Sequence, residues 1–239
     1  MQIILFNNLE EKDKSEAIKN LMTDSTPRQE FFLMIILSVL MATFGILINN
    51  ITVVIGSMLI APILYPIMSL ALGVVMASRE IIRRSIFTIL KSIAMGLTAS
   101  ALVTLFADPL GGNYSSALIS AAQPSLAYAA IAIIAGLAAS FAIIKTHLNE
   151  SLTGIAISVA LIPPLAVCGI GIARLDWTVI TAASSLFLIN LAGIMFAGVI
   201  VFSLMNLSIK RRVADKAIKE EEKEIQKETK LAEKQMDKK

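Results

Sequence analysis

Charged residues are scarce in this chain of 239 residues: Asp, Glu, Lys and Arg make up 16% of it, and 56% of the residues are hydrophobic. Soluble domains carry about 25% charged residues. Residues 31–77 contain no charged side chain. As helix, this segment would be about 70 Å long, enough to cross a hydrocarbon core of about 30 Å twice. The distribution excludes an ordinary soluble domain and predicts an all-α protein of a lipid bilayer.

Cysteine and histidine are almost absent, with Cys168 and His147 as single examples. One cysteine excludes an intramolecular disulfide, and the two residues do not make a metal site. Zinc-protease, α/β-hydrolase and phosphate-loop motifs are missing, and no apolar segment supplies a histidine that could activate a serine. The net charge of +3 comes without a dense basic patch. We therefore expect no enzyme activity, no metal, no cofactor and no nucleic-acid partner.

Apolar segments that could each span a membrane alternate with short polar links along most of the chain. Thr26 to Gln29 predicts a helix start, with Thr26 as the cap and Pro27 at the first helical position. Before it lies a polar segment, and after the last span a tail of alternating Lys and Glu predicts a solvated helix. The predicted organisation is an N-terminal segment 1–25, a six-helix membrane domain 26–208 with spans at 31–48, 51–77, 85–107, 126–144, 153–173 and 178–207, and a charged tail 209–239.

Lys and Arg are distributed unevenly between the predicted links. One side of the membrane would hold the basic residues of the N-terminal segment, of the link near residues 79–84 and of the tail. The other side would hold only Arg174. Basic loops stay in the cytoplasm, so both termini are predicted to be cytoplasmic, which an even number of spans allows.

Prolines interrupt the second and fifth predicted spans in a similar way. Ser57 precedes Pro62 by five residues, and Ser158 precedes Pro163 by five residues. Six spans would divide into two sets of three that enter the membrane from opposite sides, so we predict a 3+3 inverted repeat with proline-broken second and fifth helices. A proline frees a backbone carbonyl one turn earlier, and such carbonyls together with serine hydroxyls could bind an ion or a small polar solute. The candidate pathway residues are Ser57, Pro62, Pro66, Ser158, Pro163, Pro164 and Asn190.

Each of these features also has a purely structural interpretation. The prolines could only kink their helices while the serines bond to the backbone again, and Asn190 could join two helices instead of touching a solute. Ala132, Gly136 and Ser140 form a small-residue face that allows close helix packing, within the chain or between subunits. No predicted span has a carboxylate near its centre, which favours passive permeation or coupling to a cation such as Na⁺ over proton coupling.

Three ordered motifs carry a family resemblance. Residues 55–66, with the sequence IGSMLIAPILYP, residues 154–171, with GIAISVALIPPLAVCGIG, and residues 187–194, with FLINLAGI, resemble the signatures of domain of unknown function family 389. The resemblance implies a multi-span protein in the cytoplasmic membrane of a prokaryote, and implies no substrate.

Two functions therefore remain open. The first is a transporter or channel for a small solute or ion, assembled as a homo-oligomer. The alternative is a non-transporting scaffold or assembly protein whose charged tail recruits a partner.

Overall fold

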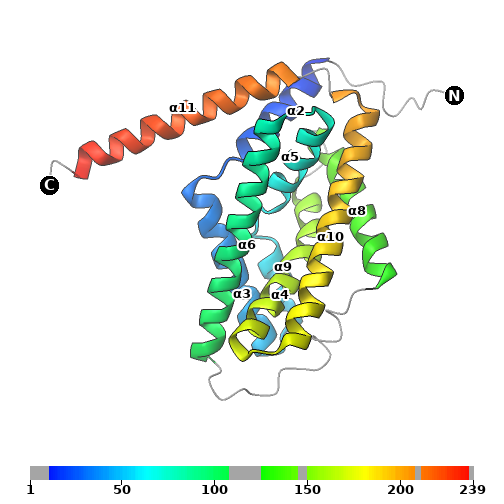
Figure 1. Ribbon diagram of the computed structural model, residues 1–239, viewed down its shortest axis with the longest axis vertical. Helices are drawn as coiled ribbons and strands as arrows, with labels where there is room; N and C mark the ends of the chain where they lie inside the picture. The colour runs from blue at the N-terminus through cyan, green and yellow to red at the C-terminus, as the bar shows by residue number, and fades with distance from the viewer. Residues whose placement is uncertain (1–10, 108–124, 145–149, 208–210, 237–239) are drawn as a thin grey trace.

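Every element in the described part of the computed structural model is a helix (Figure 1). The described residues are 11–107, 125–144, 150–207 and 211–236. The helices are α2 (Glu11–Asp24), α3 (Gln29–Leu47), α4 (Ile51–Met58), α5 (Leu64–Val75), α6 (Arg79–Ala107), α8 (Leu126–Ile144), α9 (Glu150–Arg174), α10 (Trp177–Leu204) and α11 (Arg211–Met236). The all-helical prediction is confirmed. Residues 110–120, part of the predicted link between the third and fourth spans, lie outside the described residues.

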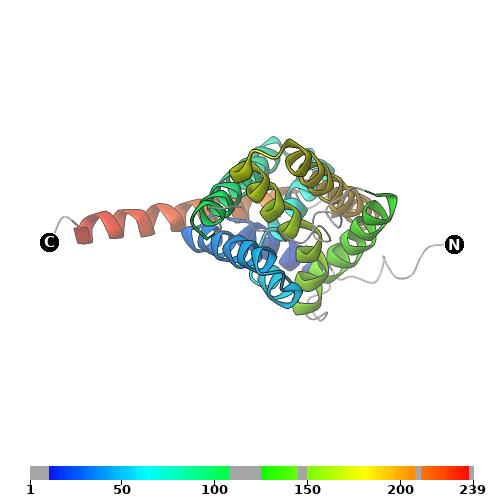
Figure 2. The ribbon, with the colours of Figure 1, turned by 90° about the horizontal axis from the view of Figure 1, so that it is seen from below.

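The helices form an elongated bundle (Figures 1 and 2). Helices α3, α6, α8, α9 and α10 run along its long axis, and α4 and α5 follow one another along the same axis. Helix α2 and the start of α11 lie together at one end of the bundle. At the opposite end are the connections from α3 to α4 and from α9 to α10.

Four helices within the described ranges are long and apolar enough to cross a membrane on their own: α3, α6, α8 and α10. Helix α5 and the part of α9 from Leu161 to Arg174 are apolar but shorter. Large apolar side chains face outward from the bundle, among them Phe106, Leu126 and Trp177, which are 84%, 91% and 75% exposed. An outer surface of this kind is consistent with a membrane protein, because soluble monomers rarely expose extended apolar patches.

The predicted second span is broken where its prolines led us to expect a break. Helix α4 ends at Met58 and α5 begins at Leu64, with Pro62 in the non-helical segment between them. The ring of Pro62 disfavours helical geometry at Ala61 and removes an N–H that the helix would use. Pro66 is the third residue of α5, a position whose N–H has no intrahelical partner in any helix.

The predicted break in the fifth span is wrong. Helix α9 continues through Pro163 and Pro164 without interruption. The φ angle that proline imposes is compatible with a helix, and only the missing N–H groups and ring contacts oppose it. Leu161, Ile162 and Leu165 around the prolines are buried, so packing against the bundle maintains the helix.

Small residues bring α8 against α10 inside the chain. An added Cβ at Gly136 would lie 2.8 Å from the Cβ of Ala197 and 2.8 Å from the Cα of Ile194. Across the same contact, an added Cβ at Gly193 would lie 2.9 Å from the Cβ of Ala132. The predicted small-residue face therefore serves packing within one chain.

The connections from α5 to α6 and from α9 to α10 are built alike. Each contains a residue with positive φ, Ala77 at 49° and Leu175 at 56°. In each, the following N–H bonds to a glycine carbonyl five residues back: Ser78 to Gly73 at 3.0 Å, and Asp176 to Gly171 at 3.0 Å. The two connections lie at opposite ends of the bundle (Figure 1).

Helix α3 begins at Gln29, but Thr26 is not its cap. Arg28 occupies the cap position and makes no side-chain cap bond. The hydroxyl of Thr26 instead donates to the Met22 carbonyl at 2.8 Å, at the end of α2, and accepts from Arg84 Nη2 at 2.6 Å. Thr26 therefore joins α2 to α6.

The charged tail forms α11, and its first half packs on the bundle. Ala214, Ala217 and Ile218 are buried there, whereas the side chains of residues 222–229 are exposed, apart from the half-buried Ile225. The helix extends away from the bundle beyond this contact (Figure 1). An ion pair between Arg28 Nη2 and Glu221 Oε2, 2.8 Å apart, attaches α11 to the start of α3.

Candidate functional site

The non-helical segment between α4 and α5 is held in place by α3. The hydroxyl of Ser38 in α3 donates to the carbonyl oxygen of Ser57 at 2.6 Å. Ser57 Oγ donates to the Val54 carbonyl at 2.6 Å, one turn earlier in α4. Irregular backbone at membrane depth is tolerated only where protein or water satisfies its polar groups. Here the carbonyl and the hydroxyl of Ser57 are both satisfied by protein.

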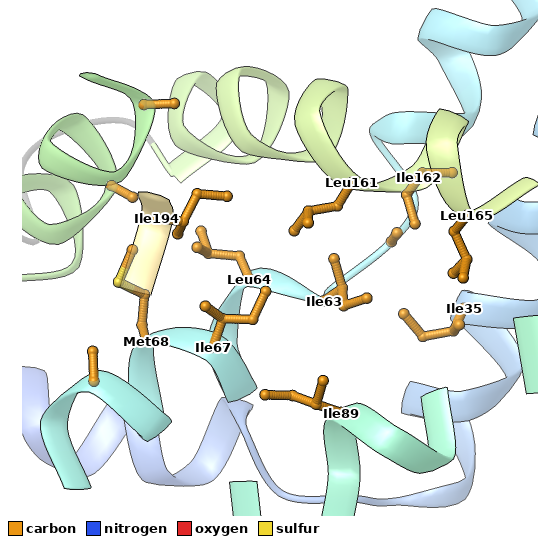
Figure 3. Packing of buried hydrophobic residues seen from close by; sticks show 14 of the residues in the cluster. Ile35, Ile63, Leu64, Ile67, Met68, Ile89, Leu161, Ile162, Leu165 and Ile194 are labelled. Atoms are coloured by element: carbon orange, nitrogen blue, oxygen red, sulfur yellow. The ribbon is translucent and has the colours of Figure 1, made fainter. Parts of the chain in front are cut away.

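Apolar side chains fill the space around this segment (Figure 3). Ile63 and Leu64 point toward Leu161 and Ile162 of α9, and all four are buried, at 0%, 6%, 0% and 0% exposure. Around them pack Ile35 of α3, Ile67 and Met68 of α5, Ile89 of α6 and Ile194 of α10. We call Ile63, Leu64, Leu161 and Ile162 the apolar seal.

The seal brings the neighbours of Pro62 and Pro163 into one cluster, but the cluster is not polar. Ser57 is fully buried, Pro66 and Pro164 are buried, and Pro62 and Pro163 are partly exposed. Asn190, in the middle of α10, is 3% exposed. Ser158 belongs to α9, but its side chain lies outside the described residues. None of the described bonds joins Ser57 to Asn190.

A second group of buried hydroxyls was not predicted from the sequence. Ser100 Oγ in α6 donates to the Ala166 carbonyl of α9 at 2.8 Å and lies 2.9 Å from Thr43 Oγ1 of α3. Three helices therefore meet at one polar point inside an apolar bundle. The sequence contains a signal for it: Ser92, Gly96, Ser100 and Thr104 are spaced by four residues on the buried face of α6.

Charged side chains gather at the end of the bundle that carries α2 and α11. The hydrogen bond to Glu221 raises the pKa of Arg28 above its ordinary value, and the nearby charges of Glu221, Glu228 and Glu224 act in the same direction against burial. Lys91 reaches toward this end and places its Nζ 4.2 Å from the ring centroid of Phe32. Among the described residues, no group of three His, Cys, Asp or Glu side chains is arranged to hold a metal ion.

Comparisons with known proteins find a family and a relative that match this chain. The family described as a domain of unknown function (DUF389) matches residues 58–196, from the end of α4 into α10. An uncharacterized protein of the archaeon Methanocaldococcus jannaschii is 30% identical over 202 residues, which are 81% of this chain. The chain spans only about 60% of the length of that relative. No solved structure matches.

Proposed function

We propose that this chain, which belongs to the DUF389 family, is a membrane transporter or channel for a small solute or ion, held here in a closed conformation. The observation that carries the proposal is the helix break between α4 and α5, whose last residue, Ile63, is buried and belongs to the apolar seal. A stable helix would serve a scaffold better, because each unsatisfied backbone group in hydrocarbon costs several kcal/mol. Discontinuous helices are instead typical of transport sites near the midplane.

Opening would follow from separating α5 from α9. Ile63 and Leu64 would then leave Leu161 and Ile162, and water could reach the non-helical backbone between α4 and α5. Hydrophobic constrictions close pores by excluding water, so a seal of four aliphatic side chains is a suitable gate. The neutral oxygens behind it, those of Ser57 and of the neighbouring backbone, suit a cation or a small polar solute.

The contacts around the glycines support the inverted repeat. In α9, an added Cβ at Gly169 would meet Ser100 of α6, and in α10 one at Gly198 would meet Ala71 of α5. These contacts correspond if residues 98 positions apart are equivalent: Ala71 with Gly169, and Ser100 with Gly198. Two further pairs of contacts have the same spacing. The contact between Gly73 and Ile81 corresponds to that between Gly171 and Val179. The contact between Met68 and Gly198 corresponds to that between Ala166 and Ser100.

This spacing revises the proline alignment within the proposed repeat. If Pro62 and Pro163 were equivalent, equivalent residues would be 101 positions apart. The contacts indicate a spacing of 98 positions, which makes Pro66 equivalent to Pro164. The segment around Pro62 then has no counterpart break in α9. We infer that the two halves share their outer architecture and differ at the break, so the moving part of the gate belongs to the first half.

The topology can be tested at two equivalent turns. Ala77 and Leu175 are both exposed and lie 98 positions apart in the chain. They belong to the α5–α6 and α9–α10 connections, which lie at opposite ends of the bundle (Figure 1). With six crossings and both termini cytoplasmic, a cysteine at position 175 should react with an impermeant maleimide added to intact cells, and one at 77 should react only after permeabilisation. Cys168 is replaced by serine in both variants to remove background labelling. Labelling of both positions from outside, or of neither, would refute the six-span arrangement.

The gate can be tested by weakening the seal. Ile63→Ala removes three carbons from its centre, and it should raise passive flux through proteoliposomes severalfold. Leu59→Ala is the matched control, since Leu59 lies beside the same break but is 58% exposed. Flux of ²²Na⁺, ⁸⁶Rb⁺ and glycerol is measured separately, with pH and Na⁺ gradients imposed one at a time. Passive permeation or Na⁺ coupling predicts that a pH gradient alone drives no uptake.

The same experiment separates transport from the scaffold alternative. Increased flux of any one probe in Ile63→Ala, with Leu59→Ala unchanged, supports a gated pathway. Unchanged flux of all three probes in a folded Ile63→Ala protein would reject the seal as a gate and leave recruitment through α11 as the better explanation.

A further inference from the structure

A pocket of about 380 Å³ lies between α6 and α11, at the end of the bundle that holds α2. It is separate from the apolar seal and shares none of its residues. Its lining combines both charges with apolar side chains: Pro27, Glu80, Arg83, Arg84, Phe87, Glu222 and Ile225.

Arg84 supplies the positive side of the pocket. Its Nη2 donates to Thr26 Oγ1 at 2.6 Å. Its Nη1 is buried and has no hydrogen-bond partner among the described residues. A buried charged donor without a partner is costly, so a small shift of the Arg84 side chain that brings Nη1 to an anion in the pocket would be favourable. Arg83, the next residue in α6, lines the same pocket and is exposed.

Glu80 and Glu222 supply the negative side. No ion pair joins either of them to a described residue, whereas Glu221 and Glu224 on the same turn of α11 are engaged by Arg28. The charges of Glu222 and Glu80 act on Arg84 across the pocket, but neither carboxylate forms an ion pair with it. Both therefore keep hydrogen-bond acceptors for a ligand. A ligand with only negative charge would meet two carboxylates, and a ligand with only positive charge would meet two arginines.

The pocket continues onto an apolar surface of α6. Phe87, at its edge, is 64% exposed, and Ile86 and Leu90 beside it are 42% and 59% exposed. Helix α6 is one of the helices long and apolar enough to cross a membrane, and the pocket lies near its first residues. In a bilayer this position falls at the boundary between headgroups and acyl chains.

We propose that this pocket binds the headgroup of a phospholipid that carries a primary ammonium next to its phosphate, which is the chemistry of phosphatidylethanolamine. The phosphate accepts hydrogen bonds from Arg84 Nη1 and from Arg83. The ammonium donates to Glu80 and Glu222, and the acyl chains lie along Phe87 and Leu90. Because Glu222 belongs to α11, a bound lipid joins the tail helix to the membrane domain. This inference is independent of the transport proposal.

The test uses the full chain in detergent, with bound lipid counted by native mass spectrometry. Phosphatidylethanolamine is titrated against phosphatidylcholine, phosphatidylglycerol and inorganic phosphate. Phosphatidylcholine has the same phosphate but no N–H donor, and phosphatidylglycerol has no ammonium. We expect phosphatidylethanolamine to bind at least ten-fold more tightly than each of the other three.

Charge-removing variants identify the site. Arg84→Gln and Glu222→Gln should each weaken phosphatidylethanolamine binding about ten-fold, which corresponds to about 1.4 kcal/mol. Arg79→Gln and Glu220→Gln are matched controls on the same two helices, outside the pocket lining, and should bind as the parent does. Glu222 is exposed, so its replacement should leave folding intact. Glu222→Gln therefore still tests the site if Arg84→Gln does not fold.

Three results would overturn the proposal. Equal binding of phosphatidylethanolamine and phosphatidylcholine would show that the ammonium is not recognised. Tighter binding of phosphatidylglycerol, strengthened further by Glu222→Gln, would indicate an anionic lipid site. Unchanged phosphatidylethanolamine binding in Glu222→Gln would place the lipid elsewhere.

Discussion

Gly169→Ala is expected to destabilise the folded protein by about 3 kcal/mol, the upper part of the range for an overpacked core. An added Cβ would lie 2.4 Å from the Cβ of Ser100 and 2.6 Å from its Oγ. Both neighbours sit close to the backbone of α6, so no flexible side-chain end can move away. Helices α6 and α9 would have to separate, and the bond from Ser100 to the Ala166 carbonyl would lengthen or break.

Gly56→Ala is the matched control. There the nearest atom is Met41 Cε at 3.2 Å, the end of a flexible side chain. The alanine also favours a helix over glycine by about 1 kcal/mol. Thermal and denaturant unfolding of both variants in one detergent should therefore show a large loss for Gly169→Ala and no loss for Gly56→Ala. Similar unfolding midpoints for the two would contradict the close approach of α6 and α9.

The helices could be predicted from the sequence because lipid constrains it so strongly. A segment of 47 residues without charge has few alternatives to membrane helices, and the helices α3, α8 and α10 begin and end within three residues of the predicted spans. The tail helix was also predicted, since alternating Lys and Glu support a solvated helix. These signals are local, and each is readable within one segment.

The two proline segments show where local signals are insufficient. Both contain two prolines, yet α4 and α5 are separate helices and α9 is one. The difference lies in the spacing of the prolines and in their packing. Pro62 and Pro66 are four residues apart, and Ser38 of α3 stabilises the non-helical segment near them. Pro163 and Pro164 are adjacent, and the residues that flank them are buried. The partner of each segment comes from elsewhere in the chain, so the sequence alone could not decide between the outcomes.

The role of the candidate site residues in transport stays a prediction, but the partners of two predicted polar residues differ from those expected. Ser57 was singled out for a solute, but its hydroxyl bonds within its own helix, as the structural interpretation had it. The sequence predicts Thr26 as a helix cap, but its hydroxyl accepts a hydrogen bond from Arg84, which lies 58 residues further along the chain. A sequence shows which polar groups exist in a segment, and the three-dimensional contacts determine which partner each one takes.

Reversing the charge of Glu221 is expected to release α11 from the bundle. Glu221 is 7% exposed and its Oε2 lies 2.8 Å from Arg28 Nη2, with Glu224 at 3.3 Å as a weaker second partner. In Glu221→Arg, two guanidinium groups would face each other in a partly buried site, where removing one partner of an ion pair costs more than at the surface. Helix α11 packs mainly on α2, through its first half, and the Arg28–Glu221 ion pair attaches the helix beyond that contact.

Hydrogen exchange of the α11 amides measures this release directly. The amides of residues 214–221 should exchange at least ten-fold faster in Glu221→Arg, which corresponds to about 1.4 kcal/mol of lost local stability. Glu220→Arg makes the same charge change at the neighbouring, exposed Glu220, whose Oε2 lies 3.9 Å from Lys19 Nζ. This control should have a much smaller effect on the exchange rates. Adding Arg28→Glu to Glu221→Arg restores an ion pair with the partners exchanged, and should recover most of the protection. Equal exchange in Glu221→Arg and Glu220→Arg, or no recovery in the double variant, would show that this ion pair does not attach the tail.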